Sequence, residues 1–325
     1  MKYLHTFFLF VCVCFSSLNL SLAQQSYPNR TIVIVVPYAA GGYYDSIARA
    51  VAPRLSETLG QPVIVENKAG ASGIIGTDYV AKSASNGYTI MVGGIGPHSI
   101  NPSLFSKLPY DPVKDFSPII LAATSPNILV VPSNSPHKTL ADLLGMANSK
   151  PGTLNYGSAG AGTSAHLAAE MFGSAAKVKI NHIPYKGSGP AVLAILAGET
   201  DMLFGTATDV FQHIKAGKLR ALAVTSADRI PAFPETPSLG EAGIQNAVAA
   251  GWYGFFAPAG TSTEIVTVLN TSINKILQIP AIKSQLSVQG TAEIIGGSPE
   301  FLARFLQSEI IKWGEVVKKS GAKAD

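Results

Sequence analysis

The chain has 325 residues, of which 47% are hydrophobic and only 14% are charged. Lysine and arginine total 24 against 20 aspartate and glutamate residues, so the formal net charge at pH 7 is +4. No basic cluster interleaved with aromatic residues stands out, so we expect no nucleic-acid partner.

The first 23 residues have the pattern of a cleavable export signal. Lys2 precedes an apolar stretch at residues 7–14, and Ser21, Leu22 and Ala23 form the small-x-small pattern that signal peptidase accepts. The apolar stretch is shorter than the about 20 residues that a membrane-spanning helix needs. We therefore predict that the mature chain begins near Gln24 and is exported to the periplasm.

Both cysteines of the chain, Cys12 and Cys14, fall inside this predicted signal. The mature protein is then expected to have no disulfide, no thiolate nucleophile and no cysteine metal site. Valine precedes each cysteine, where a lipoprotein signal needs a small residue, so we expect no lipid anchor.

Strand-like and helix-like segments alternate along nearly the whole mature chain, which is typical of α/β proteins with mainly parallel sheets. Residues 31–36 form a continuous apolar run, as expected for a strand covered on both faces. After a loop, Ile47, Val51 and Leu55 recur every fourth residue and form one face of a helix. The same alternation predicts strands at residues 62–66, 88–92, 119–123, 128–131, 153–156, 178–183, 202–204, 221–225 and 251–256, and helices at residues 76–84, 140–147, 165–172, 191–197 and 210–216.

About 300 residues usually divide into two lobes, each with its own core. The last predicted helix begins with Ser298 as N-cap and Pro299 at its first position, and the simplest topology returns it to the first lobe. The chain then crosses between the lobes near Ser125 and near Ala249, and two crossovers make a hinge. We expect one lobe to comprise residues 24–125 and 249–325, and the other residues 126–248.

Two glycine-rich loops, one in each expected lobe, are built alike. PYAAGGYYD at residues 37–45 and YGSAGAGT at residues 156–163 each follow a strand and open a helix. Glycine lets the backbone approach a ligand closely, and the first N–H groups of a helix lack partners within it. Two such helix starts facing across a cleft would hold a small organic acid. Each exposed helix end contributes only about 0.3–1 kcal/mol, so the cleft has to close.

Three other interpretations of these motifs are weaker. Gly160, Gly162 and Ala165 fit the G-x-G-x-x-A dinucleotide pattern, but residues 178–189 supply no acid to bind a ribose. A secreted hydrolase that uses Ser158 or Ser164 with His166 stays an alternative, although the G-x-S-x-G motif is absent. The mature histidines form no H-x-x-x-H pair, so we expect no metal and no other cofactor.

Several longer segments are more specific in combination. They are PYAAGG at residues 37–42, VENKAG at 65–70, NGYT at 86–89, YGSAGAGTSAHL at 156–167, PYKG at 184–187, GKLRALAV at 217–224 and GWYG at 251–254. With these segments the whole mature chain resembles the Bug-type (TctC-like) extracytoplasmic receptors of tripartite tricarboxylate transporters.

The resemblance implies a two-domain periplasmic-binding-protein fold of the Venus flytrap type (type II) and a binding protein, not an enzyme. Both loops would hold the carboxylate ligand mainly through backbone amides and ordered waters, and integral membrane transporter subunits would receive it. We expect a monomer; a role in signalling shares the same features. The ligand-binding residues implied by position are Tyr38, Ala40, Gly41, Gly42 and Asp45 in the first loop and Ser158, Gly160, Gly162, Thr163 and His166 in the second, with His98, Asn101, Tyr185, Thr206 and Asp209 as wall residues.

The chain departs from these receptors at one place. Between the glycine pair and Asp45 they usually carry a small residue and then threonine, where this sequence has Tyr43 and Tyr44. These rings would narrow the pocket, stack on an aromatic acid or point away. The pair motivates the hypothesis that the ligand is an aromatic or otherwise flat carboxylate. We expect Asp45, in the first turn of a helix, to be a structural cap.

Overall fold

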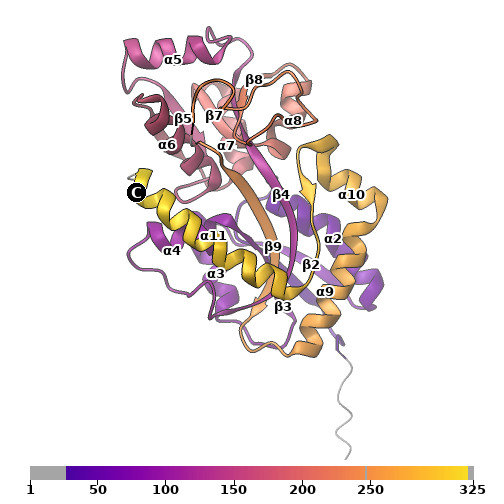
Figure 1. Cartoon of the computed structure of the whole chain (residues 1–325). Helices are drawn as coiled ribbons and strands as arrows, with labels where there is room; N and C mark the ends of the chain where they lie inside the picture. The colour runs from indigo at the N-terminus through magenta and orange to yellow at the C-terminus, as the bar shows by residue number, and fades with distance from the viewer. Residues whose placement is uncertain (1–26, 246, 321–325) are drawn as a thin grey trace, which may run out of the picture.

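The computed structural model describes residues 27–245 and 247–320. The predicted signal at residues 1–23 lies outside the described residues. Figure 1 shows two lobes, one above the other, with the long strands β4 (Phe116–Pro132) and β9 (Ala250–Pro258) running between them. The α/β flytrap architecture predicted from the sequence is confirmed.

The lower sheet has the strand order β2-β1-β3-β9-β4, with β10 (Glu293–Ile294) on the other edge of β4. Strands β1 (Ile32–Val36), β2 (Val63–Asn67) and β3 (Thr89–Gly94) are parallel, and β9 runs antiparallel to both β3 and β4. Alternate residues of β1 enter two different apolar clusters. This explains why its sequence is apolar without interruption.

Helices cover both faces of this sheet. The lower lobe contains α2 (Tyr43–Leu59), η1 (Ala71–Gly73), α3 (Ile74–Ala81), η2 (Gly96–Ile100), α4 (Asn101–Leu104), α9 (Thr263–Gln278), α10 (Pro280–Ser287), η3 (Val288–Gly290) and α11 (Pro299–Ser320). In the chain as described, no single helix is long and apolar enough to span a membrane. The pair formed by α9 and the segment Pro280–Gly290 passes that test only jointly, and it bends by 79° at its break.

The upper sheet repeats the plan. Strands β5 (Asn155–Ser158), β6 (Asn181–Pro184) and β7 (Met202–Thr206) are parallel, and β4 runs antiparallel to β7 and to β8 (Leu219–Val224). The helices of this lobe are α5 (Leu140–Ser149), α6 (Ser164–Ala176), α7 (Ser188–Ala197) and α8 (Ala207–Lys215).

The sequence predicts two strands separated at Ser125 and Pro126, but the structure has one strand, β4. Ser125 pairs with Gly251 and Pro126 with Ala250 at the point where β4 passes from the lower sheet to the upper one. A proline is tolerated in a strand where the ladder does not need its N–H. The proline therefore marks the exchange of pairing partners and does not end the strand.

The Thr225 side chain ties the strands together at this crossing. Its hydroxyl accepts a hydrogen bond from Asn127 N (2.9 Å) and donates to the carbonyl of Ala249. The backbone adds bonds from Thr225 N to Asn127 O and from Ala249 N to Thr225 O, both 2.9 Å. The buried Thr225 side chain thus connects three segments that are distant in the sequence, those of Asn127, Thr225 and Ala249.

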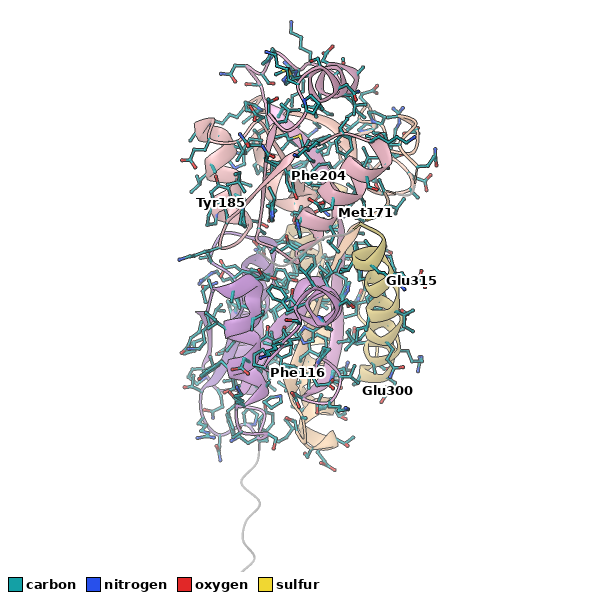
Figure 2. The ribbon with its side chains drawn as sticks, turned by 90° about the vertical axis from the view of Figure 1, so that its left-hand side faces the viewer. Phe116, Met171, Tyr185, Phe204, Glu300 and Glu315 are labelled. Atoms are coloured by element: carbon teal, nitrogen blue, oxygen red, sulfur yellow. The ribbon has the colours of Figure 1, made fainter. Side chains whose placement is uncertain are left out.

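Helix α11 reaches beyond the lower lobe. Ser298 caps it as predicted, because its Oγ accepts from Phe301 N at 3.2 Å. The helix packs beside β4 and α4, and it also contacts α6 of the upper lobe. Figure 2 shows Glu300 at its lower end and Glu315 near the junction of the lobes. Trp313 is fully buried and donates to Glu309 Oε2 at 2.7 Å.

We expect Thr225→Val to lower the free energy of unfolding by about 1–3 kcal/mol, because the buried Asn127 N–H loses its acceptor. Urea unfolding measures this. Thr267→Val is the matched control, since Thr267 is exposed on α9 and bonds only locally to Thr263 O. Its expected effect is below about 0.5 kcal/mol. Equal losses in the two variants would contradict the role given to Thr225.

Candidate functional site

The first glycine loop joins β1 to α2 and is held by Asp45. This carboxylate accepts from Gly41 N (3.2 Å), Arg49 Nε (2.9 Å) and Asn67 Nδ2 (3.0 Å). Gly41 has a φ of 93°, which favours glycine, and Gly42 is the N-cap of α2. Asp45 is therefore the structural cap that the sequence predicts, and it fixes the loop from behind.

The pKa of Asp45 is lowered in the folded chain. Burial alone would raise the pKa, but the hydrogen bonds from Arg49, Asn67 and Gly41 together outweigh it. The ionised form is thus the form that stabilises the loop.

The second glycine loop joins β5 to α6 and is held by its own side chains. Thr163 Oγ1 donates to Gly160 O (2.7 Å) and accepts from His166 N (3.3 Å), which caps α6. His166 Nδ1 accepts from Gly162 N at 3.1 Å. Gly160 and Gly162 have φ values of 124° and 73°, so both depend on the freedom of glycine.

Ser158 contacts a histidine that the sequence did not suggest. Its Oγ lies 2.6 Å from Nε2 of His182. Strands β5 and β6 are parallel, with Tyr156 opposite His182 and Ser158 opposite Pro184, so Ser158 and His182 are diagonal neighbours on one face of the sheet. Ser158 has no exposed surface, and its Oγ also accepts from Gly160 N at 3.1 Å. Its nearest histidine is His182 rather than His166, and no substrate reaches a hydroxyl buried in this way. The geometry therefore gives the hydrolase alternative no accessible nucleophile at Ser158.

The lobes touch through backbone and glycine. Ala39 N of the first loop donates to Lys186 O of the upper lobe at 3.1 Å. A Cβ added at Gly189 would lie 2.8 Å from the carbonyl oxygen of Ala40, and one at Gly187 would lie 3.3 Å from Ala39 N. Side chains at these positions would hold the lobes apart, so glycine permits the closed arrangement.

Between the loops lies a small enclosed space, the inner pocket. It is lined by Tyr38, Ala39, Gly42, Tyr43, Tyr44, Ile95, Gly96, Ala159, Thr163, Ser164, Ala165, Ser188, Thr206, Asp209 and Tyr253. Its free volume is about 30 Å³, room for about two or three water molecules. An organic acid therefore enters only when the lobes or the tyrosine rings move apart. Among these lining residues there is no lysine, arginine or histidine.

Two larger pockets share lining residues with the inner pocket and are called here its first and second mouth. The first mouth lies beside η1 and the second glycine loop and includes Tyr38, Ser72, Gly160 and Tyr185. The second mouth lies beside α7 and α8 and includes Gly41, Tyr185 and Asp209. Figure 2 shows Tyr185 at the edge of the upper lobe, above the lower lobe.

Tyr43 and Tyr44 have different positions. The Tyr43 hydroxyl donates to Leu286 O of α10 at 2.7 Å, so its ring is directed into the core. The Tyr44 ring packs between Tyr38 and Tyr253, with centroid distances of 4.8 and 4.7 Å. Both rings contact Tyr253, Tyr43 edge-on at 4.9 Å, while Tyr44 also packs on Tyr38.

Asp209 is the single acidic residue among those that line the inner pocket. It lies in the first turn of α8, and burial raises its pKa to about 7. Hydrogen bonds from Ser188, Thr206 and the backbone N–H of Tyr43 act in the opposite direction. The Tyr43 N–H belongs to the start of α2, so a carboxyl group of the upper lobe contacts an anion-binding helix end of the lower one.

The fifteen residues implied by the resemblance fall into two groups. Nine line the inner pocket or its mouths: Tyr38, Ala40, Gly41, Gly42, Gly160, Thr163, Tyr185, Thr206 and Asp209. Six lie behind these walls: Asp45, His98, Asn101, Ser158, Gly162 and His166. Most of the second group support the loops through the hydrogen bonds described above; Asn101 donates to Ser72 O at 3.1 Å.

His98 is a core histidine in this structure. It is fully buried, and its ring stacks on Phe256 at 4.2 Å and meets Phe116 edge-on at 4.9 Å. Burial lowers its pKa to about 3, so the ring is neutral. His98 packs beneath β3 and does not line the pocket.

The lining residues that were not predicted from the sequence include Ile95, Ser188 and Tyr253. Tyr253 lies in the GWYG segment and Ser188 directly follows PYKG, so both carried a signal as part of segments already noted. Across the described ranges, 27–245 and 247–320, no group of three or more His, Cys, Asp or Glu residues is arranged to hold a metal ion.

Comparison with known proteins identifies the family. A family model described as "Tripartite tricarboxylate transporter family receptor" matches residues 47–322. The chain belongs to this receptor family. The receptor is 38% identical to BugT of Bordetella pertussis over 303 residues, 93% of each chain. The solved structure of the periplasmic binding protein BugD superposes with a TM-score of 0.87 at 34% identity, covering 92% of this chain and all of that one.

A third similar protein, Rpa4515 of R. palustris, was solved with adipate. The receptor is 37% identical to it with a TM-score of 0.88, over 92% of this chain and all of that one. Family members are thus periplasmic binding proteins, and at least one of them binds a carboxylate.

We expect Gly189→Ala to weaken ligand binding by the receptor about tenfold, which corresponds to about 1.4 kcal/mol. The added Cβ meets the Ala40 carbonyl oxygen across the cleft at 2.8 Å. Calorimetric titration measures the affinity. Gly145→Ala is the matched control, because Gly145 lies in α5, outside the pocket walls, and its added Cβ would meet nothing within 4 Å. A loss as large in the control would show that close glycine approach is not the cause.

We expect Asp45→Asn to lower the free energy of unfolding by about 1–2 kcal/mol at neutral pH. Because the folded pKa of Asp45 is lowered, the carboxylate stabilises the chain above its unfolded pKa of about 4 and loses this effect as the pH falls through the folded value. The difference from wild type should therefore shrink in acid, as measured by urea unfolding across pH. Glu57→Gln, in an exposed pair with Arg54, is the control. A difference that stays constant with pH would exclude the carboxylate as its source.

Proposed function

We propose that this chain is a periplasmic receptor that closes its two lobes on one small organic acid and delivers it to the membrane subunits of a tripartite transporter. Residues 24–125 and 249–325 would form one lobe and residues 126–248 the other, after removal of a signal at residues 1–23. The proposal includes no catalytic step, so the chain would not be an enzyme, and it would act as a monomer.

The observation that carries the proposal is the position of the two helix starts. Gly42 and Tyr43 at the start of α2, and Thr163 and Ser164 at the start of α6, all line the same inner pocket from opposite lobes. The N-terminus of a helix presents unpaired N–H groups and a partial positive charge, which suit a carboxylate. With no cationic side chain among the lining residues, these backbone donors are the positive element of the pocket.

Closure strengthens this weak attraction. A helix end exposed to water contributes about 0.3–1 kcal/mol, and a partly buried one up to about 2 kcal/mol. In the closed arrangement the surrounding tyrosine rings exclude water from both helix ends. The ligand is therefore held firmly when the lobes are together and weakly when they part, which is what delivery to a membrane subunit requires.

The shape of the ligand follows from Tyr44. Its ring packs with Tyr38 and Tyr253 in the inner pocket, so a flat acid that enters would replace one tyrosine contact with a stacking contact. We infer that aromatic or otherwise flat carboxylates are the favoured class.

The test is a thermal-shift and titration series with aliphatic dicarboxylates and benzoate derivatives, followed by small-angle scattering. We expect at least one acid to raise the melting temperature by several degrees, since a ligand at 100 times its dissociation constant adds about 2.7 kcal/mol. The radius of gyration should fall on binding. Micromolar binding with no compaction would refute closure, and a response limited to aliphatic acids would refute the inference about flat ligands.

A further inference from the structure

The inner pocket contains an acceptor that the protein does not satisfy. Asp209 Oδ2 is buried and has no hydrogen-bond partner among the residues the structure describes. The groups that oppose the effect of burial on this carboxyl are the hydroxyls of Ser188 and Thr206 and the N–H of Tyr43. A buried acceptor left without a donor is unfavourable, because it has lost water and gained nothing.

The charged and titratable groups around Asp209 supply no cation. Tyr43 of α2 and Tyr253 of β9 face it, and both interact with its charge as neutral phenols. In the second mouth it shares the wall with His213 of its own helix and with Tyr185 and Glu199 of the upper lobe. Burial lowers the pKa of His213, so this ring is neutral at pH 7. Lysine and arginine are absent from the residues that line the inner pocket and this mouth.

A second polar group in the pocket is also unsatisfied. Tyr44 Oη is buried and makes no hydrogen bond to the described part of the chain. Its hydroxyl lies near the backbone of Gly94 and Gly96, where β3 ends. The pocket therefore contains, beside the N–H groups at the start of α2, an acceptor at Asp209 that the protein leaves unmet.

Two kinds of ligand group would meet that acceptor differently. A hydroxyl or an ammonium group donates to Oδ2 and completes the hydrogen bonding of the carboxyl. A methyl group leaves the oxygen unpaired, and a second carboxylate adds a like charge beside it. The polarity of the pocket thus discriminates among acids that share the same first carboxylate.

We propose that Asp209 makes this receptor select organic acids that carry, besides their carboxylate, a hydroxyl or an ammonium group that donates a hydrogen bond to Asp209. The inference rests on the proposed function and deepens it. The Tyr43 N–H that bonds Asp209 belongs to the other lobe, so it reaches this carboxyl only when the lobes are closed. In the closed form the ligand's donor and this N–H together complete the hydrogen bonding of Asp209.

Two matched sets of acids test the selection by calorimetric titration. The aliphatic set is 4-hydroxybutanoate, 4-aminobutanoate, pentanoate and butanedioate. The aromatic set is 4-(hydroxymethyl)benzoate, 4-(aminomethyl)benzoate, 4-ethylbenzoate and benzene-1,4-dicarboxylate. In the set that fits the pocket, we expect wild-type protein to bind the hydroxyl or ammonium member at least tenfold more tightly than the methyl member. Comparing the affinities of the hydroxyl and ammonium members shows which donor the pocket accepts.

At about pH 8.5, above its pKa of about 7, Asp209 is ionised, and Asp209→Asn then removes the charge and keeps the shape of the side chain. We expect it to bind the ammonium member at least tenfold more weakly than wild type and the dicarboxylate more tightly. Asp228→Asn is the matched control for net charge, because Asp228 is exposed and outside the pocket walls. Its ligand preferences should equal those of wild type. If Asp209→Asn does not fold, Asp209→Ser provides the same comparison with a smaller neutral side chain.

Two results would overturn the inference in distinguishable ways. If acids bind but wild type and Asp209→Asn rank them alike, or wild type does not favour the donor-bearing members, Asp209 does not select the ligand and the receptor function stands. If no acid of any set binds wild-type protein, the proposed function fails, and the inference fails with it.

Discussion

The site depends on how closely two backbones approach each other across the cleft. The first loop meets the start of α7 through Ala39 N and Lys186 O, and Gly187 and Gly189 leave no side chain between them. Only at this separation do the starts of α2 and α6 line one small space. A receptor that uses helix ends instead of arginine or lysine needs this geometry, because the attraction of a helix end fades within its first turn.

Much of this architecture could be predicted from local sequence. The apolar run at β1 required cover on both faces, and the order of strand, glycine loop and helix placed two helix starts in different lobes. Asp45 was identifiable as a cap because its partners Gly41 and Arg49 lie within four residues of it. Such features depend on neighbours in the chain, which the sequence displays directly.

What could not be predicted arises from contacts between distant segments. Pro126 suggested a strand end, yet β4 continues because its partner changes from one sheet to the other at that point. Ser158 meets His182 through the register of β5 and β6, 24 residues apart. Tyr43 and Tyr44 are adjacent in sequence and both contact Tyr253 of β9. The Tyr43 hydroxyl donates to Leu286 O of α10, whereas the Tyr44 ring also packs on Tyr38. No local sequence pattern predicts which of the two tyrosines makes which contact.

Helix α11 contacts both lobes, and this affects the outer surface of the molecule. It is anchored on β4 and α4 of the lower lobe, while part of it contacts α6, whose first turn lines the inner pocket. In the lobe movement proposed above, the upper lobe rotates and α6 slides against α11. The surface shape formed by these two helices would then differ between an empty and an occupied receptor. A partner that contacts both helices at once would therefore distinguish an occupied receptor from an empty one at a surface far from the ligand.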